Sequence, residues 1–193
     1  MKRYYLLAAI GLMVGCGENK TTNEVSTTSL EGYPPNSEII DYSDTPGLSK
    51  ATVMLGENIE QEGDYLNNQR NGSWTEYHSN GVVKSITTYV NGKKQGVSVL
   101  MDNRGSLESK VYFHNDQLDG ESLIYERGKI IERKTYLNGK LEGAVTKYYR
   151  SGTKMEESNY KNGLIHGAAK WYDQAGNVTL EYEYNEGKLV QND

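Results

Sequence analysis

Apolar and polar positions alternate over short distances in roughly the last two thirds of the chain, from Tyr65 to Lys188. The runs are about five to eight residues long, rich in Tyr, Val, Ile and Thr, and free of proline. Runs of this kind, bounded by glycine, favour strands over helices. At residues 83–89, alternation places Val83 and Tyr89 on one face of a strand. We therefore predict an all-β protein, an antiparallel meander of about ten strands in one elongated, twisted sheet, with an extra strand near residues 52–55 left open.

The runs form a repeat of about 24 residues. Its unit reads Y-x-N-G-x-x-x-G-x-x-x-x-Y-x-x-x-G, followed by seven residues before the next unit. Successive units begin 24, 24, 23, 24 and 24 residues apart. The only phenylalanine of the chain takes one of the leading positions, so that position requires an aromatic ring. The leading residues are Tyr65, Tyr89, Phe113, Tyr136, Tyr160 and Tyr184.

Glycine marks the same repeat more sharply. All 14 glycines after Tyr65 fall at three positions of the unit. The Asn-Gly pair signals a hairpin turn, because both residues tolerate the positive φ angles that tight turns need. Asn68 and Asp116 replace two of these glycines and tolerate the same conformation. The predicted structural turn glycines include Gly72, Gly92, Gly96, Gly120, Gly139, Gly143, Gly163 and Gly167.

The repeat resembles the MORN-repeat superfamily in its bacterial variant form. The N-G-x-x-x-G turns carry the resemblance, together with the sequence Gly-Ser-Trp-Thr-Glu-Tyr at residues 72–77. The resemblance implies five β-hairpin repeats that present an extended surface. Some bacterial proteins with this repeat variant look like antitoxin components, so a toxin is one implied partner. Nothing in the resemblance implies catalysis.

The first 16 residues resemble a bacterial lipoprotein signal. A basic start, Lys2 and Arg3, precedes an apolar run at residues 4–14, too short for a bilayer span of about 20 residues. The run ends just before Cys16, the only cysteine. The resemblance implies cleavage after residue 15 and acylation of Cys16, whose lipid chains would anchor the protein in a bilayer. Gly17, in place of aspartate, implies the outer membrane if the cell is Gram-negative. An ordinary cleaved signal and a buried cysteine are the alternatives.

Composition divides the mature chain in two. Residues 16–50 are rich in Ser, Thr, Asn and Glu and hold all three prolines, so we predict a disordered tether there. Residues 51–193 then form the repeat domain, although Ile39 and Ile40 leave the boundary open.

Net charge and sequence motifs exclude several classes of function. The formal net charge is −5, whereas a nucleic-acid-binding protein presents an excess of basic residues. One cysteine excludes an internal disulfide and a cysteine-cluster metal site. No catalytic or nucleotide-binding motif occurs, so we expect neither an enzyme nor a cofactor. The three histidines, His78, His114 and His166, fall in or beside turns, where we expect solvated side chains rather than metal ligands.

Two tryptophans complete the candidate sites. Trp74 and Trp171 lie two and four residues after a repeat glycine, which places them on the same face. They are candidate exposed platforms for a protein or a sugar. The leading hypothesis is a non-enzymatic envelope lipoprotein whose repeat sheet docks a protein partner. An antitoxin or immunity protein, and a peptidoglycan or glycan binder, are the alternatives.

Overall fold

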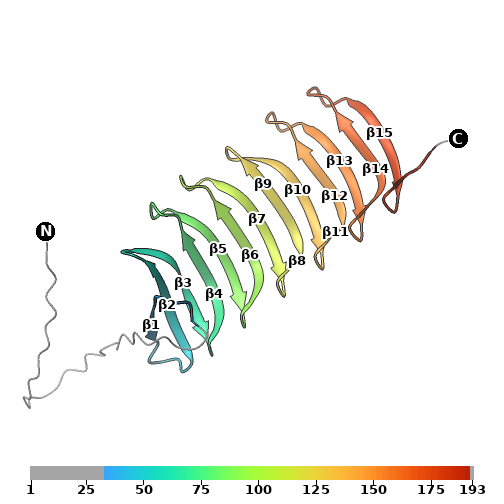
Figure 1. Ribbon diagram of the computed structural model, residues 1–193. Coiled ribbons are helices and arrows are strands. Elements are labelled where there is room, and N and C mark those ends of the chain that lie inside the picture. The colour runs from blue at the N-terminus through green and yellow to red at the C-terminus, as the bar shows by residue number, and fades with distance from the viewer. Residues whose placement is uncertain (1–32, 192–193) are drawn as a thin grey trace, which may run out of the picture.

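The computed structural model describes residues 33–191, and these residues form one antiparallel sheet of sixteen strands (Figure 1). The strands follow one another along the sheet in sequence order, as a meander does. The predicted all-β class and single elongated sheet are therefore confirmed. The predicted signal peptide, Cys16 and the first part of the tether lie outside the described residues. Within the described residues no helix is long and apolar enough to span a bilayer.

The ten predicted strands are all present, and six further strands join them. Three of the additions are the two-residue pieces β8, β11 and β16, which follow Asn-Gly or equivalent turns. The others, β1 to β3, precede the first complete repeat, and β2 contains the extra strand left open near residues 52–55. The bounds are β1 Ser37–Asp41, β2 Leu48–Leu55, β3 Asn58–Leu66, β4 Gln69–Tyr77, β5 Val83–Val90, β6 Lys93–Met101, β7 Leu107–His114 and β8 Gln117–Leu118. They continue as β9 Gly120–Glu126, β10 Lys129–Leu137, β11 Lys140–Leu141, β12 Gly143–Tyr148, β13 Lys154–Lys161, β14 Leu164–Tyr172, β15 Val178–Asn185 and β16 Lys188–Leu189.

The boundary predicted at residue 51 is too late, because the sheet already begins at Ser37. Strand β1 and the start of β2 lie in the last part of the predicted tether, and the two strands pair at Ile39 and Ala51, among other positions. Strand β2 alternates between buried and half-buried side chains along most of its length. These two strands precede the glycine repeat. Their side chains Ile39 and Ala51 are buried against Tyr65 and Trp74 of the following strands.

Asn-Gly turns have the expected geometry. Asn91 and Gly92 have φ angles of 49° and 79°, the two positive values of a type I′ turn. The amide of Gly92 donates to the carbonyl of Arg70, at the start of β4 just after the preceding turn, at 2.9 Å. Each such turn is thus bonded to the preceding hairpin along one border of the sheet. All eight predicted turn glycines have positive φ, as do Asn68 and Asp116.

A β-bulge recurs at the other end of every repeat. Glu76 pairs with Ser85 but Tyr77 pairs with Val83, so Lys84 has no cross-strand partner. The same shift follows Leu100, Ile124, Lys147 and Trp171. A bulge reverses the alternation of side chains. The predicted sharing of a face by Val83 and Tyr89 is therefore wrong.

Pairing defines two faces of the sheet. We call the face that carries Trp74 face 1 and the opposite face, which carries Thr75, face 2. Cross-strand pairs connect Trp74 to Thr87, Ser98 and Val111 in turn, all on face 1. A parallel row on the same face runs from Glu76 to Trp171, so the prediction that both tryptophans share a face is confirmed by the register. The row consists of Glu76, Ser85, Leu100, Ser109, Ile124, Glu132, Lys147, Glu156 and Trp171.

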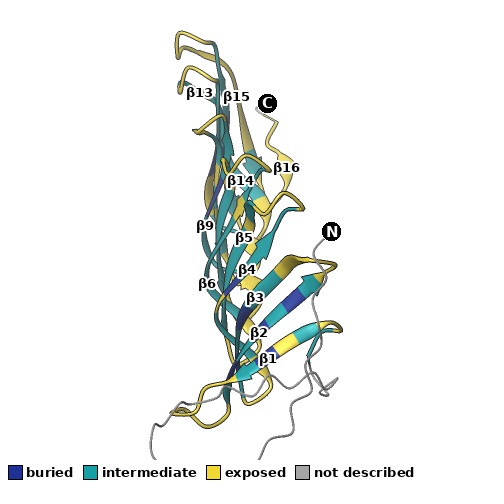
Figure 2. Ribbon diagram, turned by 90° about the vertical axis from the view of Figure 1, so that its left-hand side faces the viewer, coloured by how far each residue is buried: buried dark blue, intermediate teal, exposed yellow. Residues whose placement is uncertain are grey.

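The hydrophobic core lies at the N-terminal end of the sheet. Ile39, Ala51, Tyr65 and Trp74 form a buried cluster on face 1, against which Tyr89 packs. Figure 2 shows strands β1–β3 inclined to the column of later strands, with the dark buried residues concentrated near them. A single sheet has no second layer to cover its faces, which is why most side chains in the later repeats are only half-buried.

Candidate interaction surface

Trp74 is part of the core and is not an exposed platform, which corrects the prediction. Its side chain is 2% exposed. Nε1 donates to the carbonyl of Asp64 at 2.9 Å, and the guanidinium of Arg70 stacks on the indole at 4.1 Å. The ring covers Gly63, where an added Cβ would meet indole carbons at 2.5–2.6 Å. Alternation correctly assigned the face of Trp74 but carried no information about what covers that face.

Trp171 is half-buried and lies on β14, near the opposite end of face 1. Its ring makes an edge-on contact with Tyr182, with centroids 6.0 Å apart. It pairs across the strands with Leu180. Leu180 and Tyr182 are 44% and 41% exposed. The three side chains form an apolar patch on the last long strands, which we call the C-terminal patch. Of the two predicted platform residues, only Trp171 therefore lies at an accessible surface.

The repeated aromatic residues connect the two ends of face 1. Five of the six leading aromatic residues, all except Tyr65, pair across the strands with a glycine, as Phe113 does with Gly96. These five glycines all have positive φ, so the backbone conformation of the turn favours glycine at these positions. Lys94 adds a cation above the Phe113 ring at 5.1 Å. The equivalent pairs are Gly72 with Tyr89, Gly120 with Tyr136, Gly143 with Tyr160 and Gly167 with Tyr184.

Face 2 carries ion pairs and a linked acid. The ammonium of Lys50 lies 2.8 Å from Glu62, and the hydroxyl of Tyr77 donates to the same carboxylate at 2.6 Å. The hydrogen bonds from Lys50 and Tyr77 lower the pKa of Glu62 below its ordinary value. The bond to Glu62, with burial and the negative charge of that carboxylate, raises the pKa of Tyr77 to about 12. These groups hold β2, β3 and β4 together across face 2.

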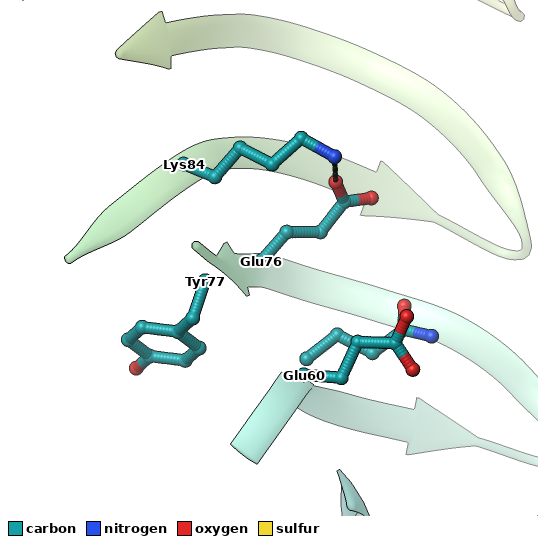
Figure 3. A pocket seen from close by; sticks show the side chains of 5 residues that line it. Glu60, Glu76, Tyr77 and Lys84 are labelled. Carbon is teal, nitrogen blue, oxygen red and sulfur yellow. Dashed lines mark ion pairs between the residues drawn. The ribbon is translucent and has the colours of Figure 1, made fainter. Parts of the chain in front are cut away.

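A shallow hollow lies next to this cluster, between the start of β3 and the end of β4 (Figure 3). It encloses about 250 Å³ and is lined by Glu60, Gln61, Glu76, Tyr77 and Lys84. Lys84 forms an ion pair with Glu76 at 3.5 Å. No group of three or more His, Cys, Asp or Glu side chains within residues 33–191 is arranged to hold a metal ion. The hollow contains no nucleophile paired with a base.

The histidines lie apart and contact neighbouring turns. The Nε2 atom of His78 is 2.9 Å from the carbonyl of Met101, one repeat later. His114 contacts Gln95 at 3.1 Å, also across a repeat. His166 accepts from the amide of Glu186 at 3.4 Å. These contacts give the histidines a role in linking successive turns, which their positions in the sequence did not reveal.

Taken together, the geometry defines a repeat protein whose single sheet exposes two broad faces and two edges. The MORN repeat variant family matches residues 70–91, 141–162 and 165–190. The chain therefore carries MORN-variant repeats, as the resemblance in the sequence implied. The intervening residues 92–140 keep the same glycine spacing and the same bulges. No curated protein matches the chain.

Proposed function

We propose that this protein is an envelope lipoprotein, anchored through acylated Cys16, whose MORN-variant sheet docks a partner protein. MORN repeats in general mediate contacts with proteins or membranes. The observation that supports docking here is the C-terminal patch. Trp171, Leu180 and Tyr182 keep apolar surface exposed where the corresponding surface of the first repeat is covered. Exposed apolar groups gathered at one place mark interaction sites more often than scattered ones do.

Anchoring is tested by replacing Cys16 with serine. We expect the Cys16→Ser protein to move from the membrane fraction to the soluble fraction, because two or more acyl chains hold a protein at a bilayer and none remain. Metabolic labelling with palmitate should be lost at the same time. Thr21→Ala, a change beside the anchor, is the matched control and should stay in the membranes. Retention of the Cys16→Ser protein would contradict the lipoprotein proposal. Fractionation of inner and outer membranes tests the implied outer-membrane location.

Docking is tested by capture from the native envelope with the full chain as bait. We expect one dominant protein prey that is lost in the variant Leu180→Lys. Leu55, which is exposed at the N-terminal end, provides the matched control Leu55→Lys. A prey that survives Leu180→Lys would contradict a docking role for the C-terminal patch.

Two other partners are distinguishable in the same capture. A tight one-to-one complex with a toxin would support the immunity reading that the repeat resemblance implies. Glycan or peptidoglycan fragments without a protein prey would support a carbohydrate platform, and their retention should then depend on Trp171. Trp74 is excluded from that platform by its burial.

A further inference from the structure

The last long strand, β15, has an outer edge that is mostly unpaired. Strand β16 pairs only with Tyr184 and Asn185, and the amide of Val190 reaches the carbonyl of Glu183 at 2.8 Å. Within the described residues, no strand pairs with residues 178–182 on the side away from β14. The equivalent strand β13 is paired on both sides, by β12 and β14. Figure 1 shows β15 at the end of the sheet.

On face 1 this edge is apolar. Leu180 and Tyr182 lie at alternate positions of the strand, both more than 40% exposed. Trp171, on the neighbouring strand, supports both, by pairing with Leu180 and by its edge-on contact with Tyr182. A strand added beside β15 would cover this surface with its own face 1 side chains.

On face 2, one cross-strand row of side chains alternates in charge, and its last member, on β15, is a glutamate. Glu157 pairs with Lys170, which pairs with Glu181, and the Lys170 and Glu181 charges are 3.1 Å apart. Glu183 lies on the same face two residues further along β15. Opposite charges in cross-strand positions are favourable and like charges are not. The next position in this row therefore favours a cation.

We propose that the edge of β15 binds an extended segment of another protein as an added strand. The segment has apolar residues at alternate positions, facing Leu180 and Tyr182, with a lysine or arginine between them, facing Glu181. Main-chain hydrogen bonds supply affinity in this mode of recognition, and alternate side chains supply specificity. The proposal deepens the docking function, on which it rests, by naming the edge and the chemistry of the partner.

The free part of this edge offers a second copy of the chain no cation. Antiparallel pairing of residues 178–182 with their counterpart places Leu180 opposite Leu180 and Glu181 opposite Thr179. Pairing along the whole of β15, with face 1 kept on one side, would place Glu181 opposite Glu181 or Glu183 and so bring like charges together. The other edge of the sheet, β1, offers Glu38 and Ile40 on face 2 and no basic residue. Acidic side chains on an edge strand also discourage aggregation. A basic partner is the one that turns this repulsion into attraction.

The test uses the full chain and two labelled nine-residue peptides, one alternating valine with lysine and the other alternating valine with glutamate. We expect the lysine peptide to bind, measured by fluorescence anisotropy, and the glutamate peptide to bind at least about tenfold more weakly. The charge-reversed protein Glu181→Lys/Glu183→Lys should invert that preference. Glu57→Lys, an exposed turn residue at the other end of the sheet, is the matched control and should leave the preference unchanged.

A peptide with a modified backbone distinguishes strand addition, which needs main-chain hydrogen bonds, from simple charge attraction, which does not. A lysine peptide N-methylated at alternate amides on its bonding edge should lose binding, and amide exchange at residues 178–182 should slow only with the unmethylated peptide. Absence of binding, equal binding of the methylated peptide, or indifference to Glu181→Lys/Glu183→Lys would overturn the proposal. If the peptide proposal fails but Leu180→Lys still loses a protein prey, the docking function stands. If the peptide binds but no envelope prey is found, the docking function is contradicted and only strand addition at the edge of β15 is supported.

Discussion

The two ends of the sheet are built from the same repeat but differ in how far their tryptophans are buried. At the N-terminal end, Trp74 is covered by Tyr65, Arg70 and the strands β1–β3, and is 2% exposed. At the C-terminal end, Trp171 lies on the same face, where its neighbours Leu180 and Tyr182 are themselves exposed. The strand β15 is exposed at nearly every position. An aromatic ring in this repeat is buried only where further strands fold against it.

Because of this difference, the N-terminal end supplies most of the buried core, whereas the C-terminal end leaves its side chains accessible. Repeat arrays gain stability from intrinsic terms and from contacts between neighbours, and their terminal units need a cover. Strands β1–β3 supply that cover at one end and concentrate the core there. Segments with few buried contacts open most readily, and binding elements are drawn from them. The C-terminal repeat combines exposed apolar side chains with an unpaired edge, as a docking element requires.

Substitution of the two tryptophans should show the largest difference in stability between the two ends of the sheet. We expect Trp74→Ala to cost about 3–5 kcal/mol in the free energy of unfolding, because it empties the centre of the core. Trp171→Ala should cost about 1 kcal/mol or less, since the side chain is only half-buried. Urea denaturation followed by circular dichroism measures both. Equal losses would show that the core is not concentrated at the N-terminal end.

A second change examines the close contact under Trp74. Gly63→Ala should cost about 1–3 kcal/mol, because the new methyl group would lie 2.5 Å from the indole unless the ring or backbone moves. The smaller ring of Trp74→Phe should relieve part of that clash. In a double-mutant cycle, Gly63→Ala should therefore be less harmful in the Trp74→Phe background. Additive effects would mean that the indole of Trp74 is not what opposes a side chain at residue 63.

Gly143 tests a turn position far from the core. Its φ is 82° and no atom lies within 4 Å of a Cβ built there, so only backbone strain opposes a side chain. Gly143→Val should cost about 1–2 kcal/mol, because a β-branched residue is poorly tolerated in the left-handed region. Gly143→Asn is the matched control and should cost less. A melting temperature unchanged by valine would show that the turn can adopt another conformation.

The hairpins could be predicted from the sequence because their signals are local. Each Asn-Gly pair and the glycine four residues later report φ angles that few other residues adopt, and all eight predicted turn glycines have them. Strands β1 and β2 carry no such signal. Ile39 and Ala51 are ordered by the first repeat, which lies many residues away in the sequence. The boundary was placed too late for that reason.

Alternation predicted faces within a strand but not across a bulge. It assigned Trp74 and Trp171 to one face, as the register shows, and failed for Val83, where the unpaired Lys84 reverses the order. The exposure of the two tryptophans depends on the strands around them. Glu181 and Leu180 were not recognised as site residues, because an edge exists only once the order of the strands is known. A glutamate and tyrosine alternation at residues 181–184 was the available signal.

The smallest expected effect concerns the acid cluster that joins β2, β3 and β4. The folded protein raises the pKa of Tyr77 to about 12, from an ordinary value of 10.0. A raised pKa means that folding favours the protonated hydroxyl. The stabilisation is therefore complete below pH 10 and is lost as the pH rises toward 12. We expect wild type to be slightly more stable than Tyr77→Phe at pH 8, with the difference in melting temperature vanishing by about pH 12.

Glu62 gives the opposite dependence and the control. Its pKa is lowered in the folded protein, so its contribution is present above the ordinary value of 4.5 and is lost as the pH falls through the folded value. Glu62→Gln should remove this acid-side dependence. It should also lower the pKa of Tyr77, seen by absorbance at high pH, because no carboxylate then accepts the hydrogen bond of the hydroxyl or opposes its ionisation by negative charge. Glu62 and Tyr77 are only half-buried, so the changes should be small beside those at the fully buried Trp74. If Glu62→Gln leaves the Tyr77 titration unmoved, burial rather than the hydrogen bond to Glu62 sets that pKa.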